Sequence, residues 1–359
     1  MKILFYINSI SHGGAERVLV NLANQFSENG NEVYLVTSLK KQWEYPVGKK
    51  VSRVSLEGED YTKAGFLQQN IKWTKKLREI IKEKRPDIVI SFMAEPNFRA
   101  ILATIGLKSK CMVSVRNDPD KEYPNAVYRI LAKILYLFAD GIVFQTEDAK
   151  KCFSASIQKK SQIIYNQVDQ KFYDYPTCDE KKDIVTCGRL VEQKNQEMLI
   201  NAFARIAEDV SENLYVYGEG KLREKLENRI REMQLEDRIY LPGNITNVEE
   251  MLSKAALFVL PSDYEGMPNA LMEAMAMGVP CISTNCPCGG PLMLFENNTE
   301  ALVSVGNAEE LADKMKYFLS NKEKCKEIGA KMKAYSLAFT PERIFKKWDE
   351  YVNAVLKNK

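Results

Sequence analysis

The chain has 359 residues, enough for two domains of ordinary size. Apolar residues make up 45% and charged residues 28%, which excludes disordered, collagen-like and coiled-coil proteins. The net charge is only +3, yet residues 1–170 carry 26 Lys and Arg against 18 Asp and Glu, and the remainder carries 25 against 30. The basic first half is therefore expected to face an anionic partner. Nucleic acid is not expected, because the surplus is modest and no recognition motif is present.

The sequence also predicts where the protein resides. No stretch has the roughly 20 uncharged apolar residues that a membrane-spanning helix needs. The apolar start, residues 2–7, continues into polar residues without a small-residue cleavage site, so we predict a buried strand and not a signal peptide. Eight cysteines are too few for a disulfide scaffold. We therefore expect a cytoplasmic protein.

The first half alternates strands with helices. It opens with a strand, a glycine turn and a helix, the usual start of a parallel βαβ sheet. The expected strands cover residues 2–10, 32–37, 87–91, 111–115, 141–145 and 161–165. The expected helices cover residues 15–28, 64–84, 96–107 and 124–138.

The second half repeats this alternation after a loop-like junction at residues 167–182. Its expected strands cover residues 183–187, 213–217, 238–241, 257–260 and 280–283. Its expected helices cover residues 195–208, 220–234, 247–255, 268–277, 307–319, 322–336 and 341–357. The simplest architecture is α/β, with two doubly wound domains facing each other. Ligands of such sheets bind at the carboxyl ends of the strands, so the expected site is the cleft between the domains.

A glycine turn follows the first strand, in Ser11-His12-Gly13-Gly14. Backbone N–H groups at such a turn, together with the helix dipole, suit an anionic ligand. A plain tight turn explains the two glycines equally well. The G-x-G-x-x-G pattern of dinucleotide-binding proteins is absent, so no nicotinamide or flavin cofactor is expected.

Two cations span a second strand-to-helix turn, which starts at Gly188. Arg189 offers a bidentate fork and Lys194 a point charge, and the two can converge on one diphosphate. The alternative is a pair of solvated surface cations.

Two carboxylates flank the start of a helix in the segment from Asp263 to Met275. Pro268 suits the first helical position, and Glu265 lies just before it, where capping alone could favour an acid. Glu273 lies among apolar residues, where an unpaired carboxylate is costly. A ligand-binding role is therefore the better interpretation of Glu273.

Other patterns give no metal or nucleophile site. Asp118 and Asp120 match the D-x-D of metal-dependent sugar-nucleotide enzymes, but the intervening proline suits a loop better. Three cysteines near residue 286 lack zinc-site spacing. His12 is the one histidine, so a histidine-based catalytic triad is poorly supported. We expect neither a metal nor a cofactor.

Together these motifs resemble the family-4 retaining glycosyltransferases of the GT-B fold, over nearly the whole chain. The resemblance rests on Gly13-Gly14-Ala15-Glu16-Arg17, Gly188-Arg189-Leu190 with Lys194-Asn195, Gly218-Glu219-Gly220, and Glu265 with Glu273. Within the family the chain is most similar to bacterial enzymes that extend lipid-linked saccharides. The resemblance implies an N-terminal acceptor-side domain at residues 1–170, a nucleotide-sugar domain at 171–340, and a C-terminal helix at 341–359 that crosses back to the first domain.

The resemblance also implies roles for individual residues. Arg189 and Lys194 would hold the donor diphosphate, Glu273 the ribose hydroxyls, and Glu265 the transferred sugar, with Arg189, Lys194 and Glu265 as the catalytic set. Further donor contacts are implied at Gly13, Gly14, Asn166, Gly188, Gly218, Gly220, Asn244, Gly266, Met267, Pro268, Asn269 and Ala270. Arg116 and His12 fall on the acceptor side. Many relatives have a histidine where this chain has Arg116, which would then contact the sugar or an acceptor diphosphate.

The expected function is transfer of a hexose or N-acetylhexosamine from a nucleotide sugar, with UDP favoured, to a free or polyprenyl-diphosphate-linked saccharide. No metal is needed, because fixed positive groups can stabilise the leaving phosphate. A non-catalytic partner subunit is the alternative, although such proteins tend to lose the Arg, Lys and Glu set. An epimerase of the same fold is a third hypothesis. It is disfavoured because such enzymes use several catalytic histidines and carboxylates, and this chain has one histidine.

The basic segment between residues 72 and 85 carries seven Lys and Arg near Leu67, Ile71 and Trp73. It could dock on anionic lipid headgroups or on a polyprenyl diphosphate, which would place the protein peripherally on the cytoplasmic face of the membrane. A solvated charged helix face is the competing interpretation.

Overall fold

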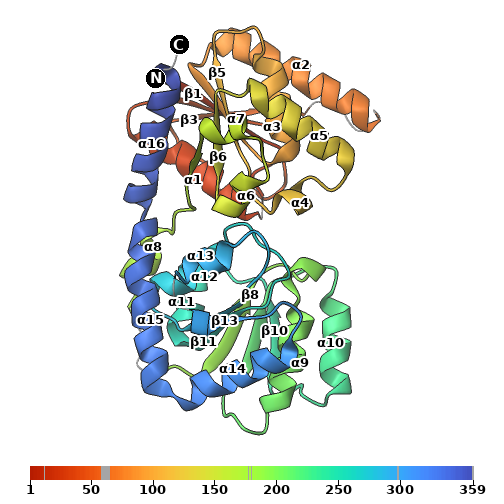
Figure 1. The fold of residues 1–359 in the computed structure, drawn as a ribbon, viewed down its shortest axis with the longest axis vertical. Coiled ribbons are helices and arrows are strands. Elements are labelled where there is room, and N and C mark those ends of the chain that lie inside the picture. The colour runs from red at the N-terminus through yellow and green to blue at the C-terminus, as the bar shows by residue number, and fades with distance from the viewer. Residues whose placement is uncertain (12, 58–64, 177, 179, 297–298, 358–359) are drawn as a thin grey trace. The chain divides into compact units, whose positions relative to one another are not determined.

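The computed structural model describes residues 1–11, 13–57, 65–176, 178, 180–296 and 299–357. The chain forms two compact units, each built on a parallel sheet (Figure 1). Unit 1 comprises Met1–Asn166 and Glu342–Lys359, and unit 2 comprises Gln167–Pro341. The predicted α/β class with two doubly wound domains is confirmed.

Unit 1 contains a seven-stranded sheet of order β3-β2-β1-β4-β5-β6-β7, with every pair parallel. The strands are β1 (Lys2–Ile7), β2 (Glu32–Thr37), β3 (Val51–Ser55), β4 (Ile88–Phe92), β5 (Lys110–Ser114), β6 (Gly141–Phe144) and β7 (Ser161–Ile163). The helices are α1 (Gly14–Glu28), α2 (Phe66–Lys84), α3 (Ala94–Thr104), α4 (Pro119–Glu122), α5 (Ala126–Leu135), the 3-10 turn η2 (Tyr136–Phe138), α6 (Glu147–Lys151) and α7 (Ala155–Lys159). The sequence did not predict β3 or the short helices α4, α6 and α7.

Unit 2 contains a six-stranded parallel sheet of order β10-β9-β8-β11-β12-β13. The strands are β8 (Asp183–Cys187), β9 (Leu214–Tyr217), β10 (Ile239–Gly243), β11 (Ala255–Leu260), β12 (Cys281–Thr284) and β13 (Leu302–Val303). The helices and 3-10 turns are α8 (Gln170–Asp174), η3 (Glu192–Lys194), α9 (Gln196–Ile206), α10 (Arg223–Glu232), α11 (Val248–Lys254), α12 (Asn269–Ala276), α13 (Gly290–Leu294), η4 (Thr299–Ala301), α14 (Ala308–Ser320), α15 (Lys322–Ser336) and η5 (Leu337–Phe339).

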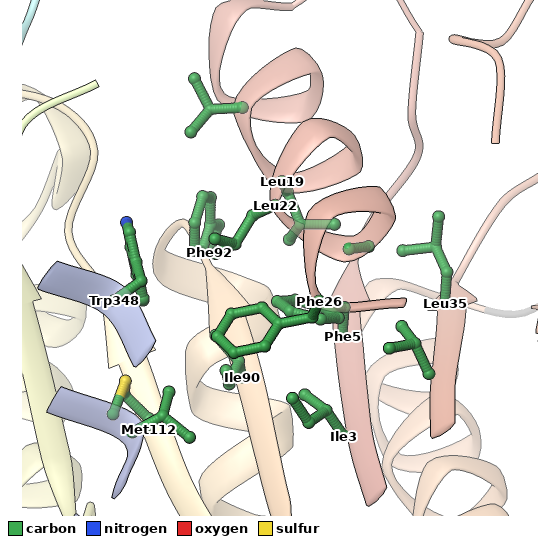
Figure 2. Packing of buried hydrophobic residues seen from close by; sticks show 14 of the residues in the cluster. Ile3, Phe5, Leu19, Leu22, Phe26, Leu35, Ile90, Phe92, Met112 and Trp348 are labelled. Atoms are coloured by element: carbon green, nitrogen blue, oxygen red, sulfur yellow. The ribbon is translucent and has the colours of Figure 1, made fainter. Parts of the chain in front are cut away.

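The last helix, α16 (Pro341–Lys357), packs into unit 1 as predicted. Trp348 stacks on Phe92 of β4 with ring centroids 5.7 Å apart, and Figure 2 shows it beside this strand. The Tyr351 hydroxyl donates to the Lys160 carbonyl at 2.6 Å. A Cβ at Gly141 would lie 2.8 Å from Val355, so glycine lets the helix approach β6 closely. None of the described helices is long and apolar enough to cross a membrane.

Candidate active site

Three strand ends of unit 2 are linked through their backbones. The Gly188 N–H donates to Tyr217 O at 3.0 Å, and the Gly218 N–H to Gly243 O at 2.8 Å. A Cβ at Gly218 would lie 2.0 Å from Gly188 O, and one at Gly220 would lie 2.3 Å from the Leu190 carbonyl oxygen. Glycine is therefore required here for backbone packing. The packing brings together the turns that carry the predicted residues Gly188, Gly218, Gly220 and, after β10, the exposed Asn244.

The two predicted cations follow β8. Arg189 is exposed, and within the described part of the chain no acid forms an ion pair with its guanidinium. Its backbone carbonyl accepts a hydrogen bond from the buried Gln196 side chain at 2.9 Å, which fixes the turn. Lys194 ends η3, and its stem lies against Gly188, since a Cβ there would be 3.5 Å from the lysine Cε. At the end of β8, Arg189 is therefore exposed to a ligand, whereas the Lys194 side chain points into unit 2.

Lys194 reaches the predicted catalytic carboxylate. Its ammonium contacts Glu265 Oε1 at 2.5 Å, and the Ser262 hydroxyl donates to the same oxygen at 2.7 Å. Glu265 is only 6% exposed, so this pair and hydroxyl compensate a charge that burial would otherwise penalise. Burial and the Glu265 charge also raise the pKa of the Cys286 thiol to about 12, so this thiol is neutral at physiological pH.

The turn between Glu265 and α12 is buried. Gly266, Met267 and Pro268 are all buried, while Asn269 and Ala270 at the first turn of α12 are partly exposed. A Cβ at Gly290, at the start of α13, would lie 1.8 Å from Gly266 O. This close contact holds the turn at Gly266 against the start of α13. The predicted Glu273 lies on the second turn of α12 and is 5% exposed.

Unit 1 has its own polar cluster, after β5. Arg116 is buried, and its guanidinium lies 4.4 Å from the Phe92 ring centroid and donates to Asn166 Oδ1. Gln145 donates to the same oxygen at 2.7 Å. Burial lowers the pKa of Arg116 to about 9, so the group stays cationic at neutral pH. Arg116 and Asn166, predicted for opposite substrates, are direct partners.

A carboxylate anchors the loop that carries Arg116. Glu122 Oε2 accepts from the backbone N–H groups of Arg116 and Asn117, both at 2.9 Å. Burial raises the pKa of Glu122 to about 7. Asp118 caps α4, accepting from the Asp120 N–H at 2.9 Å, so the D-x-D resemblance is explained by a helix cap. No group of three His, Cys, Asp or Glu suited to a metal ion lies in the described parts of either unit.

A second buried cation in unit 1 was not predicted from the sequence. Arg99 of α3 is 2% exposed and donates to Asn8 at 2.7 Å, to Ser38 at 2.9 Å and to Tyr6 at 3.1 Å. Its ring partner is Trp73 of α2, at 4.9 Å. The network holds polar side chains at the carboxyl ends of β1 and β2. These three strand-end partners are 61 to 93 residues from Arg99 in sequence, so no local motif could reveal the network.

The predicted glycine turn lies after β1. Gly13 precedes α1, and a Cβ there would be 1.7 Å from Glu16 Oε2, so the carboxylate folds back over this position. Gly14 is the first residue of α1. The predicted acceptor-side residue His12 lies outside the described residues.

Two family comparisons decide the assignment. The family described as "Glycosyltransferase Family 4" matches residues 12–172, and the one described as "Glycosyl transferases group 1" matches residues 168–335. The chain belongs to the family-4 glycosyltransferases. The matches cover the Gly13–Gly14 turn of unit 1 and all four predicted side chains of unit 2, which are Arg189, Lys194, Glu265 and Glu273.

Two relatives of this glycosyltransferase come from Campylobacter jejuni. One is named GalNAc-alpha-(1->4)-GalNAc-alpha-(1->3)-diNAcBac-PP-undecaprenol alpha-1,4-N-acetyl-D-galactosaminyltransferase and is 29% identical, covering 100% of this chain and 99% of its own. The other is N-acetylgalactosamine-N,N'-diacetylbacillosaminyl-diphospho-undecaprenol 4-alpha-N-acetylgalactosaminyltransferase, 27% identical over 96% of this chain and 97% of its own. Both names describe enzymes that act on lipid-linked glycans.

Solved structures establish the GT-B fold. Sucrose-phosphate synthase from Thermosynechococcus elongatus matches with a TM-score of 0.86 and 17% identity, covering 100% of both chains. Anabaena HepE in complex with UDP matches with a TM-score of 0.79 and 18% identity, covering 99% of this chain and 100% of that one.

Proposed function

We propose that this enzyme is a retaining glycosyltransferase that moves a hexose or N-acetylhexosamine from a UDP-sugar to a polyprenyl-diphosphate-linked saccharide. The observation that carries the proposal is the cluster at the carboxyl ends of β8 and β11. There the free Arg189 guanidinium lies in the turn that leads to the Lys194–Glu265 pair. Unit 2 would bind the nucleotide sugar, and unit 1 would bind the acceptor.

The proposed chemistry needs positive charge at the leaving group. Cleavage of a glycosyl–phosphate bond leaves negative charge on the β-phosphate. Arg189, Lys194 and the backbone N–H groups that open α12 can stabilise this charge, so the reaction needs no metal ion. When a phosphate competes for Lys194, the Glu265 carboxylate becomes available to hydrogen-bond a sugar hydroxyl, while Ser262 keeps it in place.

The resemblance to the family suggests roles for the other predicted residues. Glu273 would bind the ribose hydroxyls, and the turns at Gly218–Gly220 and Asn244 would lie near the base. The backbone N–H groups of Gly266, Met267, Asn269 and Ala270 would face the phosphates and the sugar. In unit 1, Gly13 and Gly14 would supply backbone N–H groups, and Arg116 with Asn166 would contact the sugar or the acceptor diphosphate.

Different observations support the donor and the acceptor. UDP is favoured because the fold neighbour HepE was solved with UDP. The lipid-linked acceptor is favoured by the names of the two Campylobacter relatives, which span the whole chain. Retention follows from the resemblance to the retaining family-4 enzymes. A lipid-linked acceptor would place the protein peripherally on the cytoplasmic face of a membrane.

The test is acceptor-dependent release of nucleoside diphosphate from purified protein, with UDP- and GDP-sugars and a polyprenyl-diphosphate saccharide. The Arg189→Ala and Glu265→Ala variants should lose at least about 10²-fold in turnover, as removal of a transition-state donor does. Arg205→Ala is the matched control, because Arg205 is an exposed arginine of unit 2 at the far end of α9. Product NMR then reads the anomeric configuration.

Unaltered turnover in Arg189→Ala and Glu265→Ala would overturn the proposed site. Absence of turnover in the wild type, with every donor and with short saccharides as well as lipid-linked ones, would favour the non-catalytic partner subunit.

A further inference from the structure

In the described part of unit 1, α5 together with η2 carries more large exposed apolar side chains than any other helix. Along α5 and η2, six large apolar side chains are between 38% and 64% exposed. These residues, hereafter the α5 face, are Val127, Ile130, Leu131, Ile134, Leu137 and Phe138. Soluble monomers rarely leave such a contiguous apolar strip in water, so we expect another molecule to cover the α5 face.

The opposite side of the same helix is already buried in unit 1. Tyr128, Ala132 and Tyr136 recur every four residues and form this inner stripe. The Tyr128 hydroxyl donates to Glu95 at 3.0 Å, Ala132 is 1% exposed, and Tyr136 is inaccessible with its hydroxyl 2.8 Å from that of Tyr123. The helix is therefore apolar on both sides, a pattern typical of helices buried in protein or in a membrane.

The charges of this segment favour an anionic bilayer as the occupant. Residues 126–138 contain no Asp or Glu, and their two charged residues are Arg129, whose Nε also donates to the Tyr123 carbonyl at 3.1 Å, and the exposed Lys133. Long cationic side chains can keep their charges at the headgroups while the apolar residues between them enter the acyl region. A segment of 13 residues is about 20 Å long as a helix, too short to span a bilayer and suited to lying in its interface.

The basic helix α2 is less suited to headgroup binding than its composition predicts. Arg78 donates to the carbonyls of Ala103 and Ile105, Lys76 to that of Leu56, and Trp73 is buried. Two cations and the tryptophan of α2 are thus engaged within unit 1, whereas Lys72, Lys75 and Lys82 are exposed. Its exposed apolar residues, Leu67 and Ile71, belong to a helix that packs on α3, as α5 does. Figure 1 shows α2, α3 and α5 as neighbours in unit 1.

The α5 helix is also connected to the sheet end where the acceptor is expected. Tyr128 binds Glu95, Glu95 pairs with Arg99 at 3.3 Å, and Arg99 binds Asn8 just after β1. An α5 face held in the bilayer would therefore keep the strand ends of unit 1 close to lipid headgroups. We propose that the α5 face inserts into an anionic membrane interface and brings the acceptor side of unit 1 to the lipid that carries the acceptor. The inference deepens the proposed function, on which it rests for the lipid-linked acceptor.

The test is co-sedimentation of the full chain with vesicles made of equal parts phosphatidylcholine and phosphatidylglycerol. A triple variant, Ile130→Ser, Ile134→Ser and Phe138→Ser, should lose at least about tenfold in vesicle partition, because each substitution removes exposed apolar groups that the bilayer would bury. The substituted side chains are exposed, so folding should be retained, as circular dichroism would verify. The matched control is Val305→Ser, Tyr317→Ser and Leu337→Ser, which removes three exposed apolar side chains of unit 2.

Lys133→Glu should weaken binding to the mixed vesicles but not to pure phosphatidylcholine. Wild-type partition in the α5-face variant would overturn the inference. So would a wild-type dimer that this variant dissociates, since the face would then be a protein interface.

Turnover measurements with two kinds of acceptor distinguish failure of membrane docking from failure of the proposed function. The α5-face variant should lose turnover of a polyprenyl-linked acceptor in vesicles and keep turnover of a short-chain, water-soluble acceptor. Vesicle binding through the α5 face without turnover of any acceptor would refute the proposed function alone.

Discussion

Lys194 and Glu265 form an almost buried ion pair in which each residue depends on the other. Removing one partner of such a pair strands the remaining charge and destabilises the fold by about 3–5 kcal/mol. A Lys194 or Glu265 variant would therefore lose activity partly through lost stability, whatever its effect on ligand binding. Arg189 is exposed and outside this pair, so its substitution reports on the ligand more cleanly.

The Glu122 carboxyl should make the unfolding free energy of unit 1 depend on pH. Burial raises its pKa from 4.5 to about 7, so the folded protein favours the neutral acid. The resulting stabilisation is complete below pH 4.5 and is lost as the pH rises to about 7, by up to about 3 kcal/mol. Glu122→Gln keeps an oxygen for the two backbone N–H groups, so its stability should not fall over this interval.

Urea unfolding followed by tryptophan fluorescence measures this effect in unit 1 alone, because Trp43, Trp73 and Trp348 all lie there. The difference between the wild type and Glu122→Gln should change in favour of the variant from pH 5 to pH 8. Parallel pH profiles would contradict the raised pKa.

Short motifs allowed part of the site to be predicted from the sequence. Arg189, Lys194 and Glu265 lie in the turns that follow β8 and β11, where parallel sheets bind ligands, and Glu273 lies on the helix α12 that comes next. Ser262 was missed although it lies three residues before Glu265, because a lone serine carries no signal until its partner is known. Arg116 and Asn166 were predicted separately, and only the fold shows that they are hydrogen-bonded.

At the scale of elements, Gly290 links α13 to the turn that precedes α12. Gly290→Ala would place a Cβ 1.8 Å from Gly266 O, a backbone atom that cannot move without displacing the turn. We expect a loss of more than about 2 kcal/mol of unfolding free energy, with reduced donor-dependent turnover.

Urea unfolding by circular dichroism and the nucleotide-release assay would measure both effects. Gly65→Ala is the control, since no atom of the described residues lies within 4 Å of its added Cβ and its φ is −61°. Equal stability of the two variants would show that the turn does not depend on this contact.

Most strands and long helices were predictable because their apolar periodicity is strong. The missed strand β3 is an edge strand with mostly partly exposed residues, so it lacks the apolar run of a central strand. Strand β13 has only two residues, too few for any periodicity. The short helices α4 and α6 depend on side-chain caps from Asp118 and Thr146, which are common in turns as well.

At the scale of the whole molecule, the chain builds two parallel sheets and returns to the first with α16. The apolar face of α16, with Ile344, Trp348, Val352 and Val355 buried, completes the core of unit 1. The order of alternating strands and helices predicted this architecture, whereas the substrates depend on side chains that the sheets only position. The proposed nucleotide site accordingly depends on the Arg189, Lys194 and Glu265 side chains of unit 2.

Calorimetric titration of the full chain with UDP measures whether these side chains hold a nucleotide. We predict that the wild type and Arg205→Ala bind UDP equally and that Arg189→Ala binds at least about tenfold more weakly, since hydrogen bonds to charged groups contribute about 1.5–3 kcal/mol. Equal affinity of Arg189→Ala and the wild type, or no binding of UDP to the wild type, would contradict the assignment of the nucleotide site to the ends of β8 and β11.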